Sequence, residues 1–179
     1  ANRLIQDLLD VSRIEAGGFS ISSEPVSPSM LISEASDAMT PTATAAQVTL
    51  TCHADSDLPD VMADRERMQQ VFGNLIGNAI KFTPAGGTIE VTATACGPFS
   101  VRFSIRDTGQ GISEENLPHV FDRFWQAPKA TRTGAGLGLA IAKGIIEAHT
   151  GSITATSRIS QGTAMAFDLL ERAGVEPLQ

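Results

Sequence analysis

Residues 65–82 are the segment that most constrains the fold of this chain. Its apolar residues recur at three- and four-residue intervals, as Met68, Val71, Phe72, Leu75, Ile76, Ala79 and Ile80. This spacing predicts an α-helix with one apolar face. Asp64, directly before the segment, is a favourable N-cap residue, and residues 83–87 have the composition of a turn. We expect the apolar face of this helix to pack on a sheet.

Alternating apolar and polar residues predict the strands of that sheet. The expected strands cover residues 19–23, 48–52, 89–95, 101–107, 153–157 and 163–169. Further helices are expected at residues 1–16, from Pro28 with Ser27 as its N-cap, at 113–121 and at 137–149. The helix from Pro28 is expected to end either at Pro41 or in the Ala-rich stretch after it. These elements predict an α+β fold with one layer of sheet and one layer of about three helices.

The charge of the chain excludes one large class of partners. With 20 Asp and Glu against 13 Lys and Arg, the formal net charge is -7, so no general basic surface exists to hold a nucleic-acid backbone. We expect no nucleic-acid partner, and any phosphate-binding site must be local. No apolar run approaches the roughly 20 residues of a membrane span, and Cys52 and Cys96 make no disulfide framework. We therefore expect a soluble domain in a reducing cytosol.

The predicted N-terminal helix has an apolar stripe that needs a partner. The stripe consists of Leu4, Ile5, Leu8, Leu9, Val11 and Ile14, and Gly17 and Gly18 end the helix. A single helix of about 15 residues is not stable in water, so the stripe packs either on the following domain or on helices outside this sequence. The second option is favoured. Because the sequence begins at Ala1 without Met, we expect it to be a piece of a longer chain.

The predicted helix over residues 65–82 also has a polar stripe, formed by Asn74, Asn78 and Lys81. A solvent-exposed face is one interpretation of this stripe. However, Asn is a weak helix former, and Gly73 and Gly77 beside it each cost about 1 kcal/mol relative to Ala. Residues that weaken a helix in this way favour close approach of a ligand. Amide oxygens with a lysine one turn further on suit a magnesium ion and a phosphate chain.

A second candidate site is the sequence Asp107-Thr-Gly-Gln-Gly111, which directly follows a predicted strand. A carboxylate in this position suits a ligand with a hydrogen-bond donor, such as the exocyclic amine of adenine. The alternative interpretation is a plain Asp-x-Gly turn, which is common.

A third candidate site is the glycine-rich run at residues 134–139, which leads into a predicted helix. Free backbone N–H groups and the positive end of a helix dipole favour anion binding there. The loop before it contains Lys129 and Arg132. This loop is either a mobile lid over phosphates or a flexible surface loop.

Together these segments resemble the catalytic ATP-binding domain of sensor histidine kinases, in the gyrase, Hsp90, histidine kinase and mismatch-repair ATPase superfamily. Four motifs stand in the family order. NLIGNAIKFTP (74–84) resembles the N box, DTGQG (107–111) the first glycine box, FDRF (121–124) the F box and GAGLGL (134–139) the second glycine box. LLDVSRIEAG (8–17) is similar to the end of the second helix of the dimerisation and phosphotransfer domain in these kinases.

This resemblance implies a two-layer α/β sandwich, with a mixed, mostly antiparallel sheet covered on one face by about three helices and an N-terminal helical stub. ATP and Mg²⁺ would lie between the N-box helix and the lid. The residues implied to bind ATP are Asn74, Asn78, Lys81, Phe82, Asp107, Gly109, Gly111, Ile112, Arg132, Gly134, Gly136, Leu137, Gly138 and Thr163. Asp107 would accept a hydrogen bond from the adenine amine with support from Thr163, and Asn78 would ligate magnesium. Asn74, Lys81 and Arg123 are the implied catalytic residues.

The chain departs from the family pattern at three places. Phe82 stands where many relatives have Tyr, and Ala135 replaces a frequent Thr or Ser. Trp125-Gln126 follows the F box where many relatives have Tyr-Arg. This last departure leaves open which cation, among Arg123, Lys129 and Arg132, contacts the phosphates.

Asn74 favours phosphoryl transfer over hydrolysis. In the hydrolysing members of the superfamily a Glu at this position activates water, whereas an amide cannot take up the proton. The resemblance therefore implies a protein histidine kinase, which transfers the γ-phosphate of ATP. None of His53, His119 and His149 lies in the pattern of a phospho-accepting helix, so these are expected to be structural or surface residues. The acceptor is expected before Ala1.

The implied organisation has four parts: the end of the dimerisation helix (1–17), a linker strand (18–27), the ATP-binding domain (28–172) and a tail (173–179). The implied partners are the histidine-bearing dimerisation helices of the parent protein, a response regulator and a second copy in a homodimer. The domain is expected in the cytoplasm, whether or not the parent protein is anchored in a membrane. Two other functions stay open. One is a degenerate nucleotide-binding scaffold, and the other, disfavoured by residues 8–17, is a serine kinase of the anti-sigma type.

Overall fold

The computed structural model describes residues 2–128 and 134–172. In this part of the chain the helices are α1 (Asn2–Glu15), α2 (Pro28–Ala45), α3 (Arg65–Phe82), α4 (Gly138–Ala148) and the short 3-10 helix η1 (Leu117–His119). The strands are β1 (Glu24–Val26), β2 (Thr49–Ala54), β3 (Val61–Ala63), β4 (Thr88–Cys96), β5 (Ser100–Asp107), β6 (Ile153–Ser157) and β7 (Thr163–Leu170).

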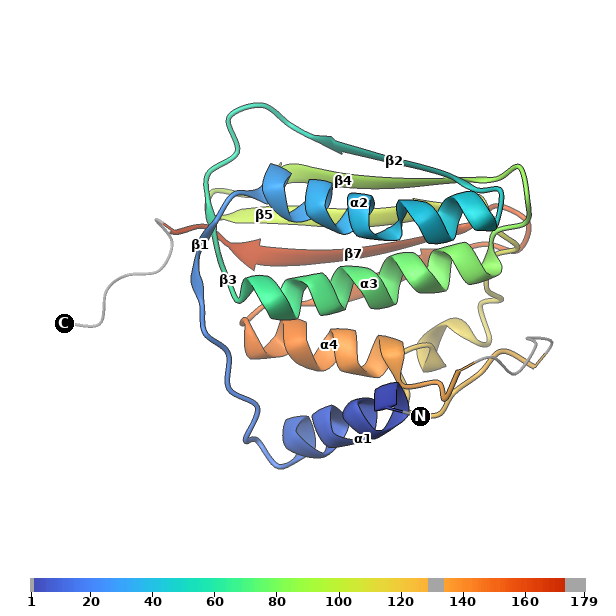
Figure 1. Ribbon diagram of the computed structural model, residues 1–179, viewed down its shortest axis with the longest axis horizontal. Helices are drawn as coiled ribbons and strands as arrows, with labels where there is room; N and C mark the ends of the chain where they lie inside the picture. Colours follow the sequence, from blue (N-terminus) through green and yellow to red (C-terminus); the bar gives the residue numbers. More distant parts are fainter. Residues whose placement is uncertain (1, 129–133, 173–179) are drawn as a thin grey trace.

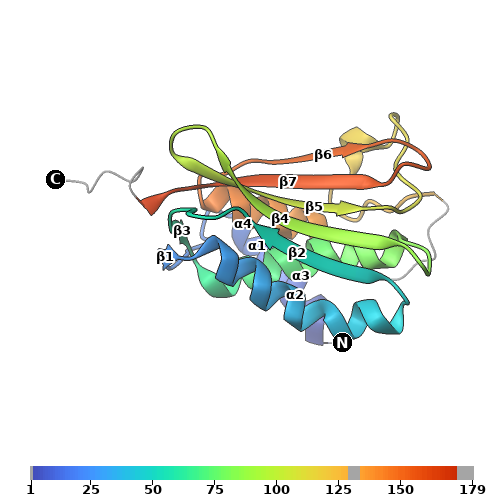
Figure 2. The same ribbon diagram turned by 90° about the horizontal axis from the view of Figure 1, so that it is seen from above.

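Five strands form one sheet in the order β2-β4-β5-β7-β6. β2 runs parallel to β4, and the other neighbouring pairs are antiparallel. Figure 1 and Figure 2 show the helices on one face of this sheet, with α3 between α2 and α4, and α1 packed outside α4. β1 and β3 form a separate antiparallel pair. The expected α+β sandwich with a mixed, mostly antiparallel sheet is confirmed.

The centre of the core lies between α3 and the middle of the sheet. Phe72 of α3, Phe103 of β5 and Phe167 of β7 are buried, with ring centroids 5.2 to 5.7 Å apart. Each buried aromatic side chain contributes about 1.5–3 kcal/mol to stability. All the apolar residues of the predicted face of α3 are buried, which confirms that prediction. The opposite side of α3, with its polar stripe, is therefore turned away from the core.

Side-chain caps fix the beginnings of two helices, as the sequence predicts. Ser27 accepts a hydrogen bond from the Met30 N–H at 3.4 Å at the start of α2. Asp64 accepts one from the Arg67 N–H at 3.1 Å at the start of α3. Each such cap contributes about 0.5–2 kcal/mol.

Three local expectations are resolved or corrected by the structure. α2 continues through Pro41 and ends in the Ala-rich stretch. The strand expected at residues 19–23 is wrong, because the chain pairs slightly later, at β1, with a β3 strand that was not predicted. The helix expected at residues 113–121 is also wrong, since only η1 and turns form there. Pro118 lies in η1 and has no N–H with which to extend a helix.

His149 ties the end of α4 to the beginning of α3. Its Nε2 accepts a hydrogen bond from the Asp64 N–H at 2.9 Å, and its Nδ1 donates to the Ile145 carbonyl at 2.7 Å. Burial lowers the pKa of this imidazole below its ordinary value of 6.5. The prediction that His149 is a structural residue is confirmed by these contacts.

We predict that the protein loses stability as the pH falls below about 6.5, because the unfolded chain then takes up a proton at His149 that the folded chain does not. His149→Gln should flatten this dependence, and should cost about 1–3 kcal/mol at neutral pH through imperfectly replaced hydrogen bonds. Urea unfolding at a series of pH values measures both effects. His53→Gln, on the exposed edge strand β2, is the control. Equal slopes for His149→Gln and the wild type would contradict the prediction.

Candidate functional site

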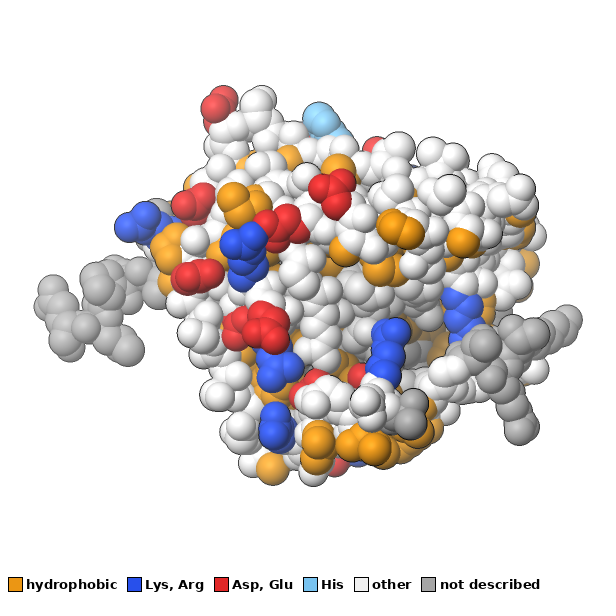
Figure 3. Space-filling model, in the orientation of Figure 1, with side chains coloured by type: hydrophobic (Ala, Val, Ile, Leu, Met, Phe, Trp, Pro, Cys, Tyr) orange, Lys and Arg blue, Asp and Glu red, His pale blue; other side chains and the backbone are white. Residues whose placement is uncertain are grey.

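A cavity of about 1550 Å³ lies beside α3. Its walls also come from the loops after β5 and before α4, and from the first turns of α1. Figure 3 shows the surface hollowed below the C-terminal end of α3, with Lys and Arg side chains at the rim of the hollow.

The structure brings most of the predicted site residues into the lining of this cavity. They are Asn74, Asn78, Lys81, Phe82, Asp107, Gly111, Ile112, Gly134, Gly136, Leu137, Gly138 and Thr163. Gly109 and Arg123 do not line it. Lys129 and Arg132 lie outside the described residues.

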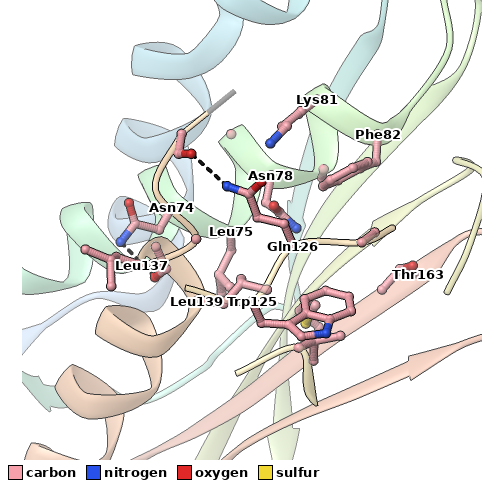
Figure 4. Close-up of a pocket in the computed structure, with 18 of the residues that line it drawn as sticks. Asn74, Leu75, Asn78, Lys81, Phe82, Trp125, Gln126, Leu137, Leu139 and Thr163 are labelled. Atoms are coloured by element: carbon pink, nitrogen blue, oxygen red, sulfur yellow. Dashed lines mark hydrogen bonds between the residues drawn. The ribbon is translucent and has the colours of Figure 1, made fainter. Parts of the chain in front are cut away.

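Asn74 is held at the cavity wall by two partners. Its Nδ2 donates a hydrogen bond to the Gly138 carbonyl at 3.1 Å, shown dashed in Figure 4, so the amide is fixed on the start of α4. Its Oδ1 accepts a hydrogen bond from Arg3 Nη2 of α1 at 3.4 Å. Asn78 and Lys81 follow along the same side of α3 (Figure 4). Amide oxygens and an ammonium group are thus presented to one space.

Asp107 is a buried carboxylate at the end of β5. Its Oδ1 accepts hydrogen bonds from the backbone N–H groups of Gly109 at 2.8 Å and Thr163 at 3.2 Å. Burial raises the pKa of Asp107, and the two hydrogen bonds act in the opposite direction. The backbone therefore fixes an acceptor in the cavity wall, which suits a ligand that offers an N–H donor.

Three glycines allow the chain to close around Asp107. An added Cβ would lie 2.5 Å from the nearest carbonyl oxygen at Gly109, 2.0 Å at Gly111 and 1.9 Å at Gly162. Gly111 and Gly162 also have positive φ angles of 74° and 81°, a conformation that favours glycine. Gly109 thus shapes the site although it does not line the cavity. Gly162 was not predicted from the sequence, and its place directly before Thr163 was the available signal.

Two hydrogen bonds join the F-box loop to the second glycine box. The Phe124 N–H donates to the Gly136 carbonyl at 2.9 Å, and Gln126 Nε2 donates to the Gly134 carbonyl at 2.8 Å (Figure 4). The resemblance to the family implies an Arg at the position of Gln126 in many relatives. In this chain the uncharged side chain of Gln126 instead links the F-box loop to the second glycine box.

Arg123 does not line the cavity and forms an ion pair with Glu15, the last residue of α1. Among the described residues, Arg3 and Lys81 are the cations that line the cavity. Arg3 was not predicted from the sequence, because its approach to Asn74 depends on how α1 packs on the domain.

The position of α1 depends on a buried acid. Asp10 is fully buried and accepts a hydrogen bond from Gln70 Nε2 of α3 at 2.8 Å, and Arg67 Nη1 lies 3.6 Å from it. Ile14 packs on Gly144 of α4, where an added Cβ would lie 2.6 Å from the isoleucine Cδ1. The rest of the apolar stripe is 43% to 59% exposed, at Leu4, Ile5, Leu8 and Leu9. α1 therefore rests on the domain and leaves this stripe open.

The glycine-rich turns, the buried acceptor and the amide-bearing helix all lie in a segment that a known protein family shares. The model of the histidine kinase-, DNA gyrase B-, and HSP90-like ATPase family matches residues 63–173. This chain belongs to that family.

The similar proteins within this ATPase family include several kinases. The adaptive-response sensory kinase SasA of Synechocystis sp. is 36% identical over 169 residues, which are 94% of this chain and 44% of the relative. Full-length ShkA in complex with AMPPNP has a TM-score of 0.85 and 32% identity, over 97% of this chain and 36% of that one. The histidine kinase ThkA in complex with the response regulator protein TrrA has a TM-score of 0.74 and 26% identity, over 95% and 48%.

The chain spans less than half the length of these relatives. The predicted resemblance to the catalytic ATP-binding domain of sensor histidine kinases is confirmed by the family match and the kinase relatives.

We predict that Asp107→Asn weakens ATP binding by about 1–3 kcal/mol. The N–H groups of Gly109 and Thr163 would hold the new amide oxygen at the Oδ1 position, so the NH₂ group would face the adenine amine. Calorimetric titration with magnesium and an ATP analogue measures the loss. Inosine triphosphate, which has a carbonyl in place of that amine, should lose less affinity. Unchanged ATP affinity would remove Asp107 from base recognition.

Proposed function

We propose that the parent protein of this chain is a sensor histidine kinase that transfers the γ-phosphoryl group of ATP to a histidine outside the chain. The observation that carries the proposal is the meeting of the N box, both glycine boxes and the buried Asp107 at one cavity. The kinase relatives, and the AMPPNP complex of ShkA, support the same activity.

The geometry supports one orientation of the nucleotide. The adenine amine would meet Asp107, near the sheet, while the triphosphate would extend toward Asn78 and Lys81 of α3. The backbone N–H groups of the second glycine box, at the start of α4, favour phosphate oxygens. Transfer to an incoming imidazole would then depend on positioning and charge stabilisation. Asn74, held on the Gly138 carbonyl, cannot act as a base toward water.

Asn78 is the proposed ligand of Mg²⁺, with help from Asn74. The described residues contain no group of three or more His, Cys, Asp or Glu that could hold a metal ion. Amide oxygens alone make a weak site, and Mg²⁺ commonly completes its octahedron with water and substrate phosphates. These side chains therefore suit an ion that arrives with the nucleotide, and the bound ion would neutralise charge on the transferred phosphoryl group.

We predict that Mg²⁺ alone does not bind at millimolar concentration, but that it tightens ATP binding. Removing Mg²⁺ with EDTA, or the variant Asn78→Ala, should weaken ATP binding by roughly tenfold or more, and the two losses should not add. Adenosine, which has no phosphates, is the control and should bind equally with and without the metal. Calorimetry distinguishes these cases, and tight Mg²⁺ binding without nucleotide would contradict the assignment.

The histidines of this chain are poor candidates for the phosphate acceptor. Both ring nitrogens of the buried His149 are used in hydrogen bonds. His53 and His119 lie beside surface aspartates, at 3.9 Å from Asp55 and 3.0 Å from Asp122. None of the three lines the cavity. An acceptor on the dimerisation helices of the parent protein, in a homodimer, fits these positions better.

We predict that the chain alone does not label itself with the γ-phosphate of radioactive ATP, and that a longer protein with the upstream helices and their histidine becomes labelled. Label that survives base and is lost in acid would identify a phosphohistidine. Asn74→Ala should abolish the transfer, and His53→Gln is the control that should retain it. A scaffold without activity would leave the longer protein unlabelled although it binds ATP.

A response regulator is the proposed next partner, because the ThkA neighbour was solved with one. The cytoplasm is the proposed location, since that compartment supplies ATP. None of the helices among the described residues is apolar and long enough to span a membrane. The boundaries at residues 17, 27 and 172 stay predictions.

A further inference from the structure

The single tryptophan of the chain lies in the cavity. Trp125, in the loop after η1, is half-buried and lines the cavity together with Thr163 and Met165 of β7. Figure 4 shows its indole projecting into the cavity, well away from the ring of Phe82. Among the described residues, none of the hydrogen bonds around Asp107, Asn74 and Asn78 involves this side chain.

Hydrogen bonds hold both neighbours of Trp125 to the second glycine box. Phe124 is held through its backbone N–H, and Gln126 is held through its side-chain Nε2. The Trp125 carbonyl oxygen is so close to Gly136 that a Cβ there would lie 2.7 Å from it. A side chain on such a support loses little freedom when a ligand binds. The loop that carries the indole is therefore held at the cavity wall before a ligand binds.

The indole of Trp125 lines the same cavity as Asp107, the residue proposed to bind the edge of the base. The Thr163 N–H donates to Asp107 at 3.2 Å, and Thr163 and Trp125 line the same cavity. A flat ring whose amine reached Asp107 would be in the same cavity as the indole and could contact it with its face. Phe82 is less suited to this role, because the Lys81 ammonium lies over its ring at 5.1 Å from the centroid.

We propose, building on the proposed function, that Trp125 stacks on the purine base of the nucleotide and sets the preference of the site for purines. Stacking of a base on an aromatic side chain contributes about 1–3 kcal/mol. This corresponds to about 5-fold to 150-fold in affinity. Asp107 reads the edge of the base, and Trp125 provides contact with its face.

The intrinsic fluorescence of the protein tests this directly. The chain has one Trp and no Tyr, so its near-ultraviolet emission reports on this indole alone. ATP should quench the emission with the same half-saturation concentration that calorimetry gives. Inorganic tripolyphosphate, which has no base, should bind without quenching. Saturation with ATP at constant emission would overturn the proposal.

Substitutions provide an independent test. Trp125→Ala should lower ATP affinity by about 5-fold to 150-fold and leave tripolyphosphate affinity unchanged, and Trp125→Phe should recover part of the loss. Phe99→Ala is the control, because this phenylalanine ring is 56% exposed and does not line the cavity. Unchanged ATP affinity in Trp125→Ala, or an equal loss for tripolyphosphate, would overturn base stacking. A wild-type protein that binds no ATP would instead overturn the proposed function, and stacking with it.

Discussion

The packing of α3 on the sheet is the interaction on which the rest of the structure depends. The three buried rings of Phe72, Phe103 and Phe167 fix the rotation of this helix about its own axis. A rotation by one residue, about 100°, would bring the side chains of the polar stripe to the core, where unpaired amides are costly. The core therefore determines that Asn74 and Asn78 face the cavity. The function of this helix is a consequence of how its apolar face is buried.

The second constraint on the structure is the burial of the Asp107 carboxylate, because burial disfavours its charged form. Asp107 keeps its place because two backbone N–H groups reach one of its oxygens. Those donors can approach only where the neighbouring chain has no Cβ, at Gly109 and at Gly162 before Thr163. Residues 107–109 and 162–163, which are far apart in the sequence, are thus in backbone contact. The glycines allow the carboxylate of Asp107 to be held in the cavity wall.

The sequence predicted features that depend on neighbouring residues. The extent of α3 and its Asp64 cap follow from local periodicity and composition, and the four boxes follow from their order. Features that depend on distant partners could not be predicted. β1 was misplaced because its partner β3 is only three residues long, the pairing of Arg123 with Glu15 requires α1 to be docked, and no local signal marks Asp10 as a buried residue.

The contacts of α1 join the wall of the cavity to an exposed apolar stripe on the same helix. Arg3 reaches Asn74 in the cavity wall, and Glu15 pairs with Arg123 of the F box. The same helix leaves the apolar stripe of residues 4–9 open. On the proposed function, a partner that covered this stripe and shifted α1 would change the contact of Arg3 with Asn74 at the ATP site. Linkage then requires reciprocity, since the factor by which the partner changes ATP affinity equals the factor by which ATP changes partner affinity. Such reciprocity would make α1 a route between the cavity and whatever covers its stripe.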